Sequence, residues 1–215
     1  MYQEPVHDPG LTPVGKLQAR LFHRYYQYHM RPTLVLTSPL RRCLQTTRIV
    51  FGPLIQSGEL RALAHPGLQE VSESLCDTGN PLSVLRNEYP EIEFLDEHFP
   101  AVWPRMLRPW KAGTIYADNP ERLLQRAEGF REWLRNVKDT EIIVVTHGGF
   151  VQFFFDNWEG FPGSSVSYGP ELGNAEAFPM TLPGPQCQDG RFRRCPLDIR
   201  PGPEYPNLWT EDPGN

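Results

Sequence analysis

The sequence predicts an α/β fold with three layers, in which a mostly parallel sheet is flanked by helices. Short apolar segments alternate with helical segments along the chain, and this order is typical of parallel strands joined by helices. The clearest apolar segment, 141–146, contains an unbroken run from Ile142 to Val145, as a strand buried on both faces requires. A chain of 215 residues is long enough for one such domain and short for two.

The N-terminal elements follow from caps and apolar spacing. The first is a helix over 12–28, capped by Thr12, and a short buried strand over 33–36 comes after it. A second helix begins at Ser38-Pro39, which supply an N-cap and a first helical residue, and it should end before Gly52.

The middle of the chain is less regular. A strand over 60–64 is followed by the stretch 71–111, which is punctuated by prolines and resembles an insertion over an active-site face. A short helix is expected within it, over 81–87. Asn119 then caps a longer helix with a clear apolar stripe.

The last elements are the strand over 141–146, a helix over 150–158 and a strand over 175–180. We therefore expect one domain over residues 1–182. Residues 183–215 are rich in proline and glycine and lack periodicity, which predicts an irregular tail.

Composition narrows the function classes. The formal charge of −5 provides no electrostatic footprint for nucleic acid. No run of 18 apolar residues and no signal-peptide pattern occurs, so we expect a cytoplasmic protein that does not bind membranes. The four cysteines lack C-x-x-C spacing, which predicts reduced thiols and no metal site. The sequence leaves the oligomeric state open.

A first candidate site is the start of the helix expected after the strand 33–36. Arg41 and Arg42 lie in its first turn, where free backbone N–H groups and the positive end of the helix dipole favour an anion. An arginine fork adds bidentate contacts to phosphate. The pattern thus predicts a phosphate site, although two solvated surface arginines fit it about as well.

A second candidate is His147, between a buried strand and two glycines. It lies at the carboxyl edge of the expected sheet, where open α/β folds bind ligands. Its imidazole is suited to donate a hydrogen bond to a phosphoryl oxygen, although a lone histidine at a strand end is more often structural.

Taken together, four segments resemble the histidine phosphatase superfamily, the phosphoglycerate-mutase-like group. They are Leu11-Thr12-Pro13-x-Gly15-x-x-Gln18-Ala19, Ser38-Pro39-Leu40-x-Arg42-x-x-Gln45-Thr46, Leu68-Gln69-Glu70 and Val144-Val145-Thr146-His147-Gly148-Gly149. Their order and spacing match the smaller branch from near residue 8 to about residue 180. Cys76-Asp77-Thr78-Gly79 and Gly173-Asn174-Ala175-Glu176 look like features of its fungal-type members.

The resemblance implies roles for individual residues. Arg42 matches a phosphate-clamping arginine, and His147 matches the histidine that steadies the transferring phosphoryl group. Glu70 lies in the region of the acid that protonates the departing oxygen, with Glu73 and Asp77 as nearby rivals. Asn174 is expected to line the pocket. The family's chemistry needs no metal or organic cofactor, and its substrate here would be a small phosphorylated metabolite.

The sequence departs from the family at its start. Members open with an apolar strand ending in Arg-His-Gly or Arg-His-Ala, whose histidine attacks phosphorus, and no such strand is present before Thr12. We therefore expect the first central strand and the nucleophile to be absent from this chain. Neither Arg42 nor His147 replaces that nucleophile by type or by place.

Three hypotheses remain. The first is a phosphatase that hydrolyses a small phosphomonoester through a phosphohistidine, with the competence of this chain in doubt. The second is a non-catalytic protein that binds phosphate or a partner. The third is a mutase of the phosphoglycerate type. Lys111, with Arg105 and Arg108, is either a reader of a second anionic group or solvated surface.

Overall fold

A computed structural model of the chain describes residues 6–26, 31–99, 103, 111–154, 180–181 and 193–194. Its centre is a sheet of four parallel strands in the order β3-β2-β1-β4. The strands are β1 (Leu34–Thr37), β2 (Arg61–Ala64), β3 (Glu93–Phe94) and β4 (Ile142–Val145).

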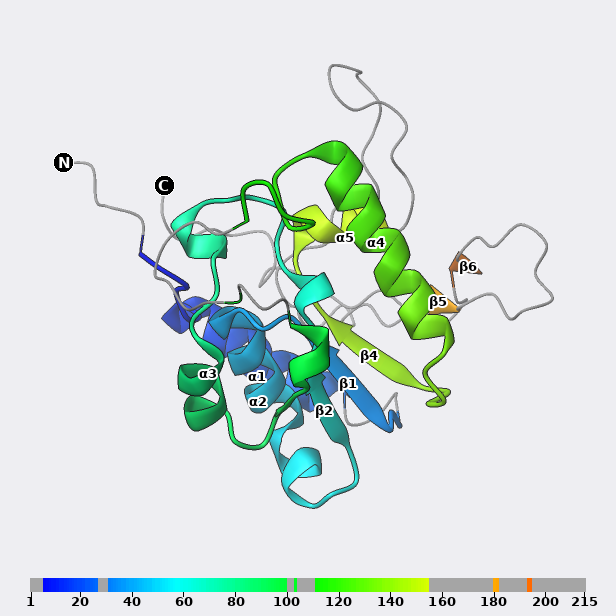
Figure 1. Ribbon diagram of the computed structural model, residues 1–215. Coiled ribbons are helices and arrows are strands. Elements are labelled where there is room, and N and C mark those ends of the chain that lie inside the picture. The colour runs from blue at the N-terminus through cyan, green and yellow to red at the C-terminus, as the bar shows by residue number, and fades with distance from the viewer. Residues whose placement is uncertain are drawn as a thin grey trace.

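Helices cover both faces of the sheet (Figure 1). The α-helices are α1 (Pro13–Tyr26), α2 (Arg41–Gln56), α3 (Leu82–Glu88), α4 (Pro120–Arg135) and α5 (Gly148–Phe154). Three single turns of 3-10 helix are η1 (Pro66–Leu68), η2 (Leu75–Asp77) and η3 (Asp96–His98).

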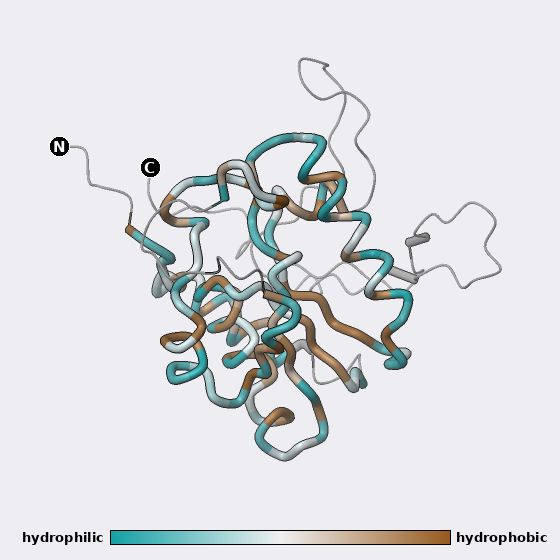
Figure 2. The backbone as a smooth tube through the Cα atoms, viewed as in Figure 1, coloured by the Kyte–Doolittle hydropathy of each residue, from teal (hydrophilic) through white to brown (hydrophobic). Residues whose placement is uncertain are grey.

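The strand β1 shows how the layers are built. Its side chains alternate, so Val35 packs with the apolar residues of α1 and α2, while Leu34 and Leu36 pack with those of α4 and α5. All three are at most 2% exposed. Figure 2 shows the resulting apolar band along the strands, between the two helical layers. The predicted three-layer α/β fold is confirmed.

The edge strand β4 differs from the prediction. All four of its residues are half-buried, whereas those of β1 are fully buried, so the strand buried on both faces is β1. Among the described residues β4 pairs with β1 on one side only. Neighbouring strands in this order are hydrogen-bonded to each other, so no further strand lies between any two of these four.

The helix α2 corrects both predicted boundaries. It begins at Arg41 after Leu40, and it continues through Pro53 to Gln56 where an end before Gly52 was predicted. Proline lacks an N–H and removes one helical hydrogen bond. The apolar core compensates, because Leu54 and Ile55 in this last turn pack against it.

The C-terminal part contains a strand that was not predicted, β6 (Arg193–Arg194), in the tail expected to be irregular. It pairs in antiparallel fashion with β5 (Met180–Thr181). Residues 175–179 of the predicted strand, and the rest of the tail, lie outside the described residues. None of the described helices combines the length and the apolar character needed to cross a bilayer.

Candidate functional site

The site lies at the edge where the carboxyl ends of three parallel strands meet. Ser38 follows β1, the loop with Glu70 follows β2, and His147 follows β4. Two hydrogen bonds tie these ends together: Ser38 N donates to Val145 O at 2.9 Å, and Thr146 Oγ1 donates to Leu68 O at 2.8 Å. This is the edge where parallel α/β sheets bind ligands.

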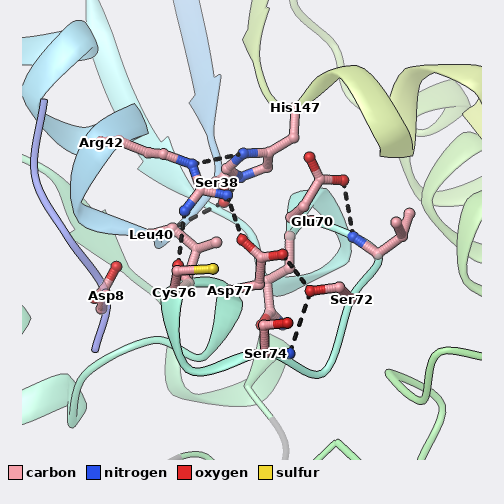
Figure 3. A network of polar contacts seen from close by, with 12 residues as sticks. Asp8, Ser38, Leu40, Arg42, Glu70, Ser72, Ser74, Cys76, Asp77 and His147 are labelled. Carbon is pink, nitrogen blue, oxygen red and sulfur yellow. Dashed lines mark hydrogen bonds and ion pairs between the residues drawn. The ribbon is translucent and has the colours of Figure 1, made fainter. Parts of the chain in front are cut away.

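His147 is buried and hydrogen-bonded through both ring nitrogens (Figure 3). Arg42 Nε lies 3.2 Å from Nδ1, and Ser38 Oγ lies 2.8 Å from Nε2. Because an arginine N–H only donates, Nδ1 must be the acceptor and Nε2 must carry the proton. The ring is therefore a neutral donor at Nε2.

Electrostatics keeps this ring neutral. Burial lowers the pKa of His147 well below its ordinary value, since an imidazolium loses hydration there. The positive charges of Arg42, Lys111 and Arg126 lower it further. His147 is thus a neutral group within a positively charged surrounding.

Arg42 is held in place by the segment η2. Its Nη1 donates to Cys76 O at 2.8 Å and its Nη2 to Asp77 Oδ1 at 2.8 Å, while Ser72 Oγ donates to the other carboxylate oxygen of Asp77. With the bond to His147, three of the five N–H donors of the guanidinium are used, and two remain for a ligand. The Arg42 side chain is 24% exposed, so it reaches the surface.

Glu70 faces this pair from the opposite loop (Figure 3). Its Oε1 accepts a hydrogen bond from Val71 N at 2.9 Å. A Cβ added to Gly149 would lie 2.5 Å from the same Oε1, so the carboxylate packs directly against the backbone of α5. Gly149 is therefore required for this close approach.

Among the three acids considered from sequence, Glu70 is the one with an unengaged oxygen at the site. Both oxygens of Asp77 are hydrogen-bonded to Arg42 and Ser72. Glu73 Oε1 accepts from Asp118 N at 2.9 Å, which turns it toward the start of α4.

Arg41 does not join the other candidates. Its guanidinium donates twice to Glu88 Oε2 on α3, at 2.9 and 2.7 Å. Its backbone N–H donates to Asp8 Oδ1 at 2.9 Å, so a buried carboxylate from the N-terminal loop already occupies the start of α2. The predicted cap, Ser38, accepts a hydrogen bond from Leu40 N at 3.3 Å and also contacts His147. Asn174 lies outside the described residues.

Cys43 lies beside the histidine, with Sγ 3.5 Å from Nε2. Burial raises the pKa of this thiol to about 12. It remains protonated near neutral pH, which leaves it unsuited to act as a nucleophile. Among the described residues no group of three or more His, Cys, Asp or Glu side chains is arranged to hold a metal ion.

Two further cations lie behind the Glu70 loop. Lys111 is 0% exposed and Arg126 is 4% exposed. The interpretation of Lys111 as solvated surface is therefore wrong, because its side chain is buried, and Arg105 and Arg108 lie outside the described residues. Arg126 falls at helical spacing from the buried Leu123 and Phe130 on α4, and a charge on that stripe was the signal that sequence analysis missed.

A profile of the histidine phosphatase superfamily (branch 1) matches residues 2–177. The chain belongs to this superfamily. The strand ends that carry Arg42, Glu70 and His147 all lie within the matched range.

Two curated proteins are similar to this histidine phosphatase superfamily member. A probable phosphatase of Schizosaccharomyces pombe is 29% identical over 149 residues, which are 69% of this chain and 66% of that protein. Phosphoglycerate mutase-like protein 1 of Arabidopsis thaliana is 29% identical over 170 residues, 67% of this chain and 58% of that protein. The chain therefore spans less than two thirds of the length of these two relatives.

Among solved structures, mycobacterial glucosyl-3-phosphoglycerate phosphatase superposes with a TM-score of 0.49 at 15% identity. The match covers 90% of this chain and 89% of that one.

Proposed function

We propose that this chain supplies the phosphate-binding and proton-donating part of a phosphomonoester phosphatase, which acts on a small phosphorylated metabolite in the cytoplasm. The observation that carries the proposal is the direct contact of Arg42 with His147, at a sheet edge that Glu70 faces from the next loop. A cationic fork and a neutral N–H donor side by side suit a phosphoryl group.

In the proposed reaction, Arg42 and His147 bind the phosphoryl oxygens. The two unused N–H groups of Arg42 donate first, and His147 Nε2 donates when a phosphoryl oxygen replaces Ser38 Oγ as its acceptor. A histidine nitrogen that none of the described residues supplies attacks phosphorus, the ester P–O bond breaks, and the departing oxygen takes a proton from Glu70. Water then attacks the phosphohistidine, gives its proton back to Glu70, and releases inorganic phosphate.

His147 itself is not the attacking ring in this arrangement. Its Nδ1 lone pair accepts from Arg42, and its Nε2 carries a proton, so neither nitrogen presents a lone pair to phosphorus. The described residues place only this one histidine in contact with Arg42. The nucleophile is therefore assigned to none of them.

The test compares two neighbouring arginines of α2. Phosphate release from p-nitrophenyl phosphate and from an alkyl monophosphate is measured for the wild type, Arg42→Ala and Arg41→Ala. We expect Arg42→Ala to lose about 10- to 100-fold, as for one or two charged hydrogen bonds. Arg41→Ala, whose guanidinium is bound to Glu88, should stay within about threefold.

Two further measurements separate the alternatives. Acid-labile phosphate trapped on a histidine after brief exposure to substrate supports hydrolysis through a phosphohistidine. Inorganic phosphate that binds in an Arg42-dependent manner without any turnover overturns hydrolysis in favour of a non-catalytic phosphate-binding protein. Turnover that requires a bisphosphorylated primer overturns it in favour of a mutase.

A further inference from the structure

The loop that carries Glu70 is held from behind by two buried cations. Lys111 Nζ donates to Glu70 O at 3.0 Å and to Ser72 O at 2.8 Å. Arg126 Nη2, from α4, donates to Gln69 O at 3.0 Å. Three of the four backbone carbonyls of residues 69–72 thus accept hydrogen bonds from these two cationic side chains.

The burial of these cations is costly and calls for an explanation. Burial, with a contribution from the charge of Arg126, lowers the pKa of Lys111 to about 7. Arg126 Nε and Nη1 have no hydrogen-bond partner among the described residues, and the guanidinium lies 4.8 Å from the ring centroid of Phe150. Packing alone would favour apolar side chains at both positions.

Their hydrogen bonds all go to the backbone of residues 69–72. Glu70 lies in the middle of this segment, and its carboxylate is confined on the other side by Gly149 and Val71. A carbonyl held by a charged donor moves less than one that faces water, so the loop cannot tilt without breaking bonds to Lys111 or Arg126. Lys111 and Arg126 therefore constrain the acid through its backbone, without contacting its carboxylate.

We propose that Lys111 and Arg126 are positioning residues that clamp the backbone of the loop 69–72 and thereby fix Glu70 for proton transfer to the departing oxygen. This inference rests on the proposed function of Glu70. The clamp itself works with either protonation state of Lys111, since a neutral amine retains two N–H groups for the two carbonyls.

The experiment uses the leaving group as its readout. An alkyl phosphate needs a proton on its departing oxygen, whereas p-nitrophenolate leaves without one. Lys111→Met keeps the apolar stem and removes the amine. We expect its kcat for the alkyl phosphate to fall about 10- to 100-fold, with p-nitrophenyl phosphate changed less than about threefold.

Two reference variants define the scale. Glu70→Gln should show the same selective loss, larger in size. Lys16→Met, at an exposed position of α1, should leave the turnover of both substrates unchanged. Misfolding lowers turnover of both substrates together, so an equal loss in Lys111→Met, or no loss at all, overturns the proposal.

Hydrogen exchange tests the clamp without turnover. The amide of Val71, which is bonded to Glu70 Oε1, should exchange at least about tenfold faster in Lys111→Met than in Lys16→Met. If the wild type hydrolyses neither substrate, the proposed function fails, and this measurement still decides the clamp. Unchanged exchange overturns it.

Discussion

Substitution of Gly149 by alanine tests the placement of Glu70 most directly. The added Cβ would lie 2.5 Å from Glu70 Oε1 and 3.0 Å from Val71 Cγ2. Ordinary van der Waals contact begins at 3.4 Å, so the carboxylate must move by 3.4 minus 2.5, or 0.9 Å. A displacement of about 1 Å in a catalytic group can cost about 100-fold in rate.

The same substitution should cost little stability. The closest conflict is with the far end of the flexible Glu70 side chain, which is free to turn away, and Val71 Cγ2 must shift by only a few tenths of an ångström. Alanine in place of glycine within a helix gains about 0.5–1 kcal/mol, and the lost hydrogen bond to Val71 N costs about 1 kcal/mol, so the two nearly cancel. We expect the unfolding free energy to change by less than about 1 kcal/mol.

The assay combines urea unfolding with turnover of an alkyl phosphate and of p-nitrophenyl phosphate. Gly148→Ala is the matched control, because nothing lies within 4 Å of the Cβ it would add. Gly149→Ala should lose alkyl phosphate turnover selectively, and Gly148→Ala should lose neither activity. Equal behaviour of the two variants would refute the argument, as would a large loss of stability in Gly149→Ala.

Three other predictions concern stability. Burial, with a contribution from His98, lowers the pKa of His65 from 6.5 to about 3, so the unfolded chain binds more protons between pH 3 and 6.5 and stability rises with pH there. The unfolding free energy, measured by urea unfolding at each pH, should rise by up to about 1.4 kcal/mol per pH unit in the wild type and by less in His65→Gln. An equal rise in both proteins would contradict the assignment. Burial lowers the pKa of Lys111 from 10.5 to about 7, so the unfolded chain binds more protons between these pH values and the stability of the wild type relative to Lys111→Met should rise with pH there; parallel curves would count against it. Leu36→Ala, at a position 0% exposed on β1, should cost about 2–5 kcal/mol of unfolding free energy, against less than about 1 kcal/mol for Leu17→Ala at 47% exposure; similar costs would disprove the layer assignment.

Local signals predicted the elements whose ends are set by their own residues. Asn119 caps α4 as expected, with its side chain accepting from Arg122 N at 3.2 Å. The start of α2 was misjudged because its cap comes from Asp8, which is 33 residues away from Arg41 in sequence. No local pattern identifies a carboxylate delivered by another loop.

The same distinction applies to the site. Arg42 and His147 were predicted from their places after strands, and the parallel sheet brings them into contact. Asp77 was weighed as an acid, and its bond to Arg42 could not be foreseen, because η2 reaches that arginine only through the folding of the insertion. Lys111 lies in the same insertion, where composition gave no direction for its side chain.

The charges of the site explain why these hidden partners matter. Within the described part of the chain, Arg42 has a carboxylate partner in Asp77, whereas Lys111 and Arg126 have backbone carbonyls and no hydrogen-bonded carboxylate. The carboxylates of Glu70 and Asp77 act on them only through space, and burial together with the charges of Arg42, Lys111 and Arg126 lowers the pKa of His147. An anion bound beside that ring would be attracted by the same field in a low-dielectric surrounding, where it acts more strongly than in water. The two buried cations thus contact the backbone of the Glu70 loop and add positive charge near Arg42 and His147, as the proposed phosphate site requires.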